Sequence, residues 1–68
     1  MAKYYMNENS QTNGDHEVHV SSCDYLLKVK NRHYLGEFTN CQDALKEAKK
    51  RDSKADGCKY CCYPCHTS

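Results

Sequence analysis

The sequence has few of the residues that build a hydrophobic core. It contains no isoleucine and no tryptophan, and only four leucines, three valines and one phenylalanine among 68 residues. A share of Leu, Ile, Val and Phe below about 20% usually leaves too little apolar surface to bury, and surface dominates volume in chains this short. A stable fold therefore needs an additional crosslink, from metal or from disulfides.

An excess of charge and long apolar runs are also missing. Ten Lys and Arg stand against nine Asp and Glu, for a net charge of +1, so the chain lacks the basic footprint of nucleic-acid or anionic-membrane binding. No stretch approaches the roughly 18 apolar residues of a membrane span, and no secretory signal is visible at the N-terminus. We therefore expect a cytoplasmic monomer without membrane contact. In that reducing compartment, dense cysteines bind metal or react more often than they form structural disulfides.

The chain is instead rich in cysteine and tyrosine, with six of each. Four cysteines crowd into the segment between residues 58 and 65. The tyrosines supply large rings that can thicken a small core while their hydroxyls stay in water.

Residues 2–38 have the patterns of strands and turns. Ala2–Met6 is rich in tyrosine, and Asp15–Val20 alternates with His16, Val18 and Val20 on one face, so both are predicted strands. Asn13-Gly14 between them predicts a hairpin turn. Arg32–Phe38 predicts a third short strand, in which Gly36 marks a bulge or a close backbone approach. Tyr25–Val29 is apolar but too short to place.

Residues 40–51 predict the single helix. Its apolar stripe has the i, i+3, i+4, i+7 spacing of a buried helix face and comprises Cys41, Ala44, Leu45 and Ala48. Asn40 is positioned to cap the first turn, and Asp43 suits the positive end of the helix. Ser53–Gly57 then predicts a stop and a turn. The expected fold is one α+β domain over residues 1–68, with a two- to three-stranded antiparallel sheet, one helix and a cysteine-rich tail at 57–66, held together by a Cys/His metal site.

The spacing of sulfur and imidazole groups is the main chemical signal. His19 and Cys23 form H-x3-C at the end of a strand, and Cys58 and Cys61 form C-x2-C after Gly57. Structural zinc sites commonly take two ligands from each of two short knuckles. We prefer this C-x2-C because Gly57 offers the φ freedom that the start of a knuckle often needs.

Other assignments remain open at this point. Cys62 and Cys65 form a second C-x2-C, followed directly by His66, and either could replace a preferred ligand. Six cysteines also allow 15 disulfide connectivities, or they could remain reduced and partly buried. We expect Cys41 to be an ordinary core residue and His16 to be packed and hydrogen-bonded rather than a ligand.

The order of these motifs resembles a known family. His19-x3-Cys23, then Phe38-x-Asn40-x2-Asp43-Ala44, then Gly57-Cys58-x2-Cys61 is similar to the small zinc domain typified by the N-terminal domain of the Ada DNA-repair proteins. The resemblance spans roughly residues 16–61 and implies four zinc ligands: His19, Cys23, Cys58 and Cys61. The chain also resembles a group of small, uncharacterised bacterial proteins with a cysteine-rich tail, a likeness that implies no function.

One departure from the Ada pattern limits what carries over. The first ligand of the Ada domain is a cysteine that accepts a methyl group, and here that position is His19, which cannot act as a thiolate. We therefore expect no methyl-acceptor chemistry and no enzyme activity. The predicted function is a non-enzymatic zinc-binding module that interacts with or regulates an unknown protein partner. A redox-responsive thiol protein and a nucleic-acid-binding zinc domain are the alternatives, the latter opposed by the charge balance.

Overall fold

A computed structural model describes residues 1–8 and 16–65, except for the side chains of residues 27 and 28. Within these described residues, four strands, one α-helix and two short 3-10 helices follow in chain order. They are β1 (Ala2–Asn7), β2 (His16–Val20), η1 (Asp24–Lys28), β3 (Arg32–Phe38), α1 (Cys41–Arg51), β4 (Ala55–Gly57) and η2 (Tyr63–Cys65). The α+β prediction is confirmed.

The sheet has the strand order β3-β1-β2-β4. β1 pairs antiparallel with both β2 and β3, whereas β4 pairs parallel with β2. The prediction of two or three antiparallel strands is therefore wrong, because the sheet is mixed and has four strands. Ser53–Gly57, predicted as a stop and turn, contains β4 instead. Three residues without an apolar pattern carry no strand signal of their own, and the pairing with β2 makes them a strand.

The three strands predicted at residues 2–38 are confirmed where the structure describes them. β3 has the irregularity expected near Gly36, because its register with β1 shifts between Tyr4 and Tyr5 and Gly36 has a φ of 127°. Such a φ favours glycine. The predicted Asn13-Gly14 turn lies outside the described residues. Tyr25–Val29, left unplaced, overlaps η1.

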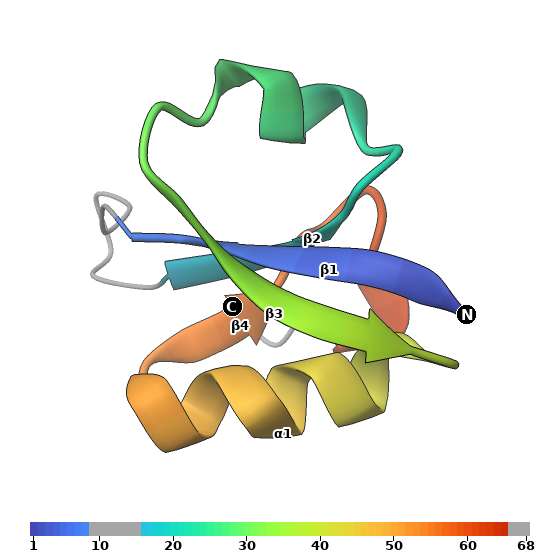
Figure 1. Ribbon diagram of the computed structural model, residues 1–68, viewed down its shortest axis with the longest axis vertical. Coiled ribbons are helices and arrows are strands. Elements are labelled where there is room, and N and C mark those ends of the chain that lie inside the picture. The colour runs from blue at the N-terminus through green and yellow to red at the C-terminus, as the bar shows by residue number, and fades with distance from the viewer. Residues whose placement is uncertain (9–15, 66–68) are drawn as a thin grey trace.

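α1 is the helix predicted from the sequence, and its start is capped as expected. The backbone N–H of Asp43 donates to Asn40 Oδ1 at 2.9 Å. Of the expected stripe, Ala44 and Ala48 are fully buried, while Cys41 and Leu45 are only partly buried. Small buried residues let the helix approach the strands closely, and Figure 1 shows α1 lying along one side of the sheet while η1 lies on the other.

The helix also explains the parallel strand. Parallel strands need a crossover connection, usually a helix, and α1 carries the chain from β3 at one sheet edge to β4 at the other. The buried core that results is small and contains sulfur as well as carbon: it is Tyr4, Met6, Val18, Cys23, Leu26, Ala44, Ala48, Ala55, Cys58, Cys62 and Cys65. Within the described residues, the one α-helix is too short and too polar to cross a membrane.

Candidate metal centre

The first half of the site lies where β2 ends. His19 is on the strand and is 1% exposed, and Cys23 follows a tight turn and is also buried. The backbone N–H of Cys23 donates to the Val20 carbonyl at 2.9 Å, which closes that turn. This turn returns the Cys23 thiol toward the His19 imidazole, as the H-x3-C spacing predicted.

The second half follows β4 and is attached to the same strand. The backbone N–H of Cys58 donates to the Val18 carbonyl at 2.9 Å, next to the parallel pairing of β2 and β4. A further turn, closed by the Cys62 N–H and the Cys58 carbonyl at 2.9 Å, places Cys61 beside Cys58. The pairing of β4 with β2 therefore brings together residues about 40 positions apart in the sequence.

Gly57 is required here, but not for the reason expected. Its φ is not positive, because Gly36 is the glycine with a positive φ among the described residues. Instead, a Cβ on Gly57 would lie 2.7 Å from the Cys62 carbonyl oxygen and 2.7 Å from Cys65 Cβ. The glycine allows the backbone after the knuckle to pack directly on β4.

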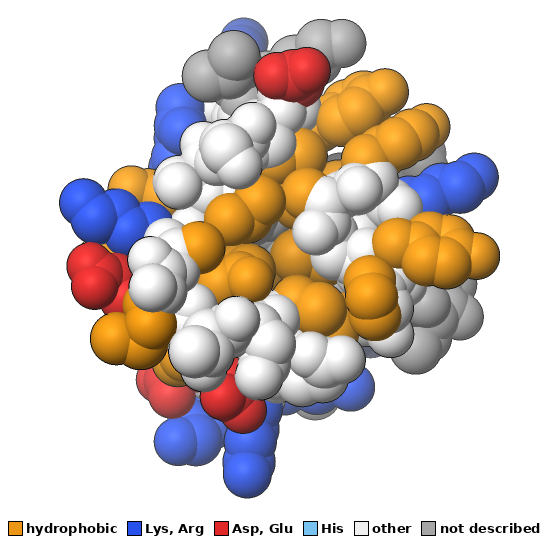
Figure 2. Space-filling view, turned by 90° about the vertical axis from the view of Figure 1, so that its right-hand side faces the viewer, with side chains coloured by type: hydrophobic (Ala, Val, Ile, Leu, Met, Phe, Trp, Pro, Cys, Tyr) orange, Lys and Arg blue, Asp and Glu red, His pale blue; other side chains and the backbone are white. Residues whose placement is uncertain are grey.

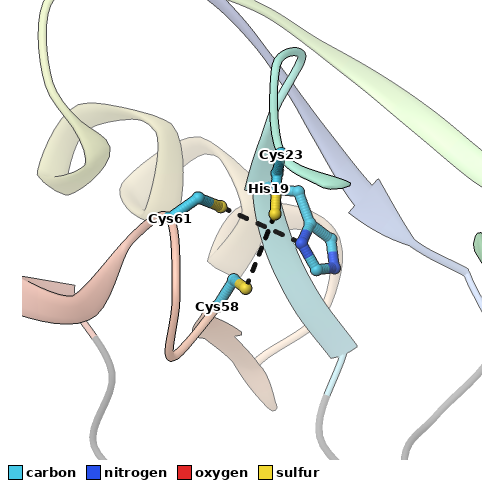
Figure 3. Close-up of side chains that lie close together, drawn as sticks. All are labelled: His19, Cys23, Cys58 and Cys61. Carbon is cyan, nitrogen blue, oxygen red and sulfur yellow. Dashed lines mark hydrogen bonds between the residues drawn. The ribbon is translucent and has the colours of Figure 1, made fainter. Parts of the chain in front are cut away.

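The four predicted ligand residues come together in one cluster. One ligand atom from each of His19, Cys23, Cys58 and Cys61 lies within 4.8 Å of all the others. Cys23 Sγ and Cys58 Sγ are 4.0 Å apart, and Cys61 Sγ is 3.9 Å from His19 Nδ1 (Figure 3). Zinc–sulfur bonds of about 2.3 Å and zinc–nitrogen bonds of about 2.0–2.1 Å imply tetrahedral edges of about 3.6–3.8 Å. These two separations are thus only slightly longer than a tetrahedral zinc site needs.

The imidazole of His19 is oriented as a metal ligand would be, and it is neutral. Figure 3 shows one ring nitrogen directed toward Cys61 and the other directed away from the sulfurs. Burial lowers the pKa of His19, so the ring is neutral and Nδ1 can offer a lone pair. Nε2 is buried and has no hydrogen-bond partner among the described residues, although Glu17 Oε1 lies 3.6 Å away. Metal-bound histidines usually donate their other ring N–H to a carboxylate of this kind.

Hydrogen bonds and burial have opposite effects on the ionisation of the three thiols. Backbone N–H groups favour thiolate: Val20 N–H donates to Cys61 Sγ and Tyr60 N–H donates to Cys58 Sγ, each at 3.4 Å. Burial opposes ionisation and prevails at Cys58, whose pKa is raised to about 12. Burial likewise raises the pKa of Cys23, and the contact with Cys62 together with burial raises that of Cys61. A bound cation would reverse this balance, because it stabilises neighbouring thiolates directly.

The remaining cysteines fall into two groups. Cys62 is fully buried with its Sγ 3.8 Å from Cys61 Sγ, but it is not one of the four clustered residues. Cys41 and Cys65 form a disulfide between the start of α1 and η2. The prediction that Cys41 is an ordinary core residue is therefore wrong, and no spacing rule in the sequence pairs it with Cys65. His66, the other open alternative, lies outside the described residues.

A pair of tyrosines lies close to the cluster, whereas His16 is engaged elsewhere. Tyr25 lies two residues after Cys23, and Tyr60 lies two residues after Cys58. Their rings stack with centroids 4.3 Å apart and planes 17° apart. Sequence reasoning did not anticipate this stack. His16 is confirmed as packed and hydrogen-bonded: its Nδ1 lies 3.0 Å from the Asn7 carbonyl oxygen, and its Nε2 lies 3.0 Å from Asp52 Oδ2.

Comparisons with known proteins found no match. No protein-family model matches the chain, and neither curated proteins nor solved structures gave a match.

Proposed function

We propose that the protein is a small, non-enzymatic zinc-binding module. The observation that carries the proposal is the convergence of one imidazole and three thiols within 4.8 Å, contributed by two short knuckles. A set of one nitrogen and three sulfur donors matches the preference of structural zinc sites, whereas magnesium and calcium take oxygen ligands.

A structural role for the zinc is favoured over a catalytic one. Catalytic zinc sites keep one position open for water or substrate, whereas structural sites are closed by four protein ligands. His19, Cys23 and Cys58 are buried and Cys61 is half-buried. Three surface pockets among the described residues are lined by other side chains. Four protein ligands, three of them buried, would leave no open coordination position, which favours the structural role.

The module's role is proposed to be protein interaction, by a monomer in the cytoplasm. Figure 2 shows hydrophobic side chains grouped on one face of the molecule, with most Lys and Arg toward its margins. Large exposed apolar side chains include Tyr25, Tyr60 and Tyr63. Tyrosine is enriched at protein interfaces, where its ring is buried and its hydroxyl stays wet.

Nucleic-acid binding is the less favoured alternative. Arg51 is engaged with Glu8 at 2.8 Å, and Lys50 lies 3.4 Å from Glu47. Because acidic side chains neutralise part of the helix surface, we expect no measurable duplex-DNA binding at physiological salt. A titration with sub-micromolar affinity that falls steeply with salt would favour the nucleic-acid function instead.

The decisive experiment counts zinc on the natively purified protein. Native mass spectrometry should find one zinc per chain, and cobalt(II) substitution should give the visible absorption of a tetrahedral thiolate site. Cys23→Ser and Cys58→Ser should each abolish stoichiometric binding. Cys62→Ala is the matched control, because it removes a buried neighbouring thiol outside the cluster and should leave one equivalent bound. Zinc binding that survives Cys58→Ser but not Cys62→Ala would transfer the ligand role to Cys62 and refute the proposed site.

A further inference from the structure

The Cys41–Cys65 disulfide joins two elements that the backbone connects only distantly. Cys41 is the first residue of α1 and Cys65 is the last residue of η2, 24 positions later. Between them the chain passes through α1, β4 and the Cys58–Cys61 knuckle. The loop closed by this disulfide therefore includes half of the proposed metal ligands.

η2 and the knuckle form one packed unit. The Cys65 N–H donates to the Cys62 carbonyl at 2.9 Å, and the Cys62 N–H donates to the Cys58 carbonyl at the same distance. Cys65 also packs against Gly57, where an added Cβ would lie 2.7 Å from its own Cβ. A restraint on Cys65 is therefore transmitted to Cys58 through two hydrogen bonds and a tight backbone contact.

We propose that Cys41–Cys65 is a reversible redox site that sets the metal affinity of the four-residue cluster. The inference rests on the proposed zinc-binding function and adds its regulation. In the oxidised form, α1 holds η2 in place, so the second knuckle is preorganised for metal. In the reduced form this covalent restraint is missing, so the knuckle must lose more conformational freedom when it binds the ion.

The co-reactant is a low-molecular-weight thiol such as glutathione. Its thiolate attacks Cys41 Sγ, because Cys41 is partly exposed whereas Cys65 is 5% exposed. A mixed disulfide forms at Cys41, and Cys65 leaves as a thiolate that takes a proton. A second glutathione then attacks the mixed disulfide, giving oxidised glutathione and the Cys41 thiol. Two glutathione thiols are thus oxidised for each protein disulfide reduced, and the reverse sequence restores it.

Thermodynamic linkage gives the proposal a second, independent readout. If the disulfide raises zinc affinity by a given factor, zinc must favour the disulfide over the dithiol by the same factor. A tenfold change in affinity corresponds to a shift of 29.6 mV in the midpoint potential of a two-electron couple. Zinc-loaded protein should therefore be harder to reduce at Cys41–Cys65 than metal-free protein.

The test measures both sides of this linkage on the full chain. Zinc affinity is measured by competition with a chromophoric chelator, for oxidised protein, for protein reduced with a phosphine, and for a Cys41→Ala/Cys65→Ala double variant. We expect the reduced protein and the double variant to bind one zinc at least tenfold more weakly than the oxidised protein. Glutathione redox buffers, with alkylation and peptide mass spectrometry at Cys41 and Cys65, should give a midpoint at least about 30 mV more negative with zinc than without.

Two controls separate the proposed clamp from other effects. Gly36→Ala strains β3 at the far edge of the sheet, so it reports how much affinity is lost through lower stability alone. Cys62→Ala should retain the full redox dependence, because it leaves the disulfide intact. The reduced wild-type protein keeps the test valid if the double variant does not fold.

Four results would overturn the inference. Affinities within twofold in the two redox states, or a midpoint that zinc does not move, would show that the disulfide and the cluster are uncoupled. A second zinc bound by the reduced protein would show that Cys41 and Cys65 are ligands in their own right. One equivalent of zinc bound equally in both states would leave the proposed function standing, whereas no zinc in either state would refute both.

Discussion

Gly57→Ala tests whether the close packing of the knuckle on β4 shapes the metal site. The new Cβ would lie 2.7 Å from the Cys62 carbonyl oxygen, 2.7 Å from Cys65 Cβ and 2.9 Å from the Cys65 carbonyl carbon. Two of these three atoms belong to the backbone, so a change of side-chain rotamer cannot relieve the contacts. Overpacking typically costs about 1–3 kcal/mol, and we expect about 3 kcal/mol here because the backbone must move.

The size of this effect is large for the domain. A chain of this length is expected to have a free energy of unfolding of about 3–10 kcal/mol. Equilibrium denaturation of the zinc-loaded protein, followed by circular dichroism, should therefore show a clear loss of stability. The cobalt(II) spectrum should change as well, because movement of the backbone after Gly57 displaces Cys58 and Cys61 from their positions around the ion.

Gly36→Ala is the matched control. Its φ of 127° makes any side chain strained, but the nearest atoms to its added Cβ, in the Phe38 ring, lie at ordinary contact distances of 3.5 and 3.6 Å. Backbone strain of this kind costs about 1–3 kcal/mol, so stability should also fall. The cobalt spectrum should nevertheless stay that of the wild type, since β3 lies at the opposite edge of the sheet from β4. An unchanged stability and spectrum for Gly57→Ala would refute the reasoning.

The structure supports three further predictions. Metal-free protein should be most stable between about pH 6.5 and 9. Below this window the unfolded chain protonates His19 more readily than the fold does, because burial lowers the pKa of His19 in the fold, so stability falls. Above it the unfolded chain ionises Cys58 more readily, because burial raises the pKa of Cys58 in the fold, so stability falls again. Thermal melts across pH would show this, and bound zinc should remove the alkaline loss, because coordinated sulfur is already thiolate. Asn40→Ala removes the bond to the Asp43 N–H and should cost about 1 kcal/mol in a denaturation experiment, while an unchanged midpoint would contradict the cap. Leu26→Ala should cost about 2–5 kcal/mol, because Leu26 is 1% exposed and one of only four leucines; a loss below 1 kcal/mol would contradict its core position.

The sequence predicted the parts of the fold that local pattern determines. Asn40 followed by an apolar stripe was sufficient for α1, and alternation from His16 to Val20 was sufficient for β2. β4 was not predictable in this way. Ala55, Asp56 and Gly57 have no strand propensity, and they become a strand because α1 delivers them alongside β2.

The four residues of the cluster were predicted from the sequence, whereas the four-stranded mixed sheet that supports them was not. Two-ligand spacings are local, so His19/Cys23 and Cys58/Cys61 could be recognised before their contact was known. The choice of Cys58/Cys61 over the second C-x2-C rested on Gly57, which proved important for close approach rather than for φ. The Cys41–Cys65 pairing was beyond reach, because it depends on where η2 packs against the start of α1.

The strand order has a consequence for how the protein is made. His19 and Cys23 leave the ribosome early, whereas Cys58 and Cys61 follow only after α1 and β4 have been synthesised. During that interval the nascent chain holds only two of the four clustered residues, which cannot enclose an ion, and β2 lacks its β4 neighbour. The centre can therefore be completed only after β4 and its knuckle have been synthesised, and a ribosome stalled before Ala55 would leave β2 without its β4 neighbour.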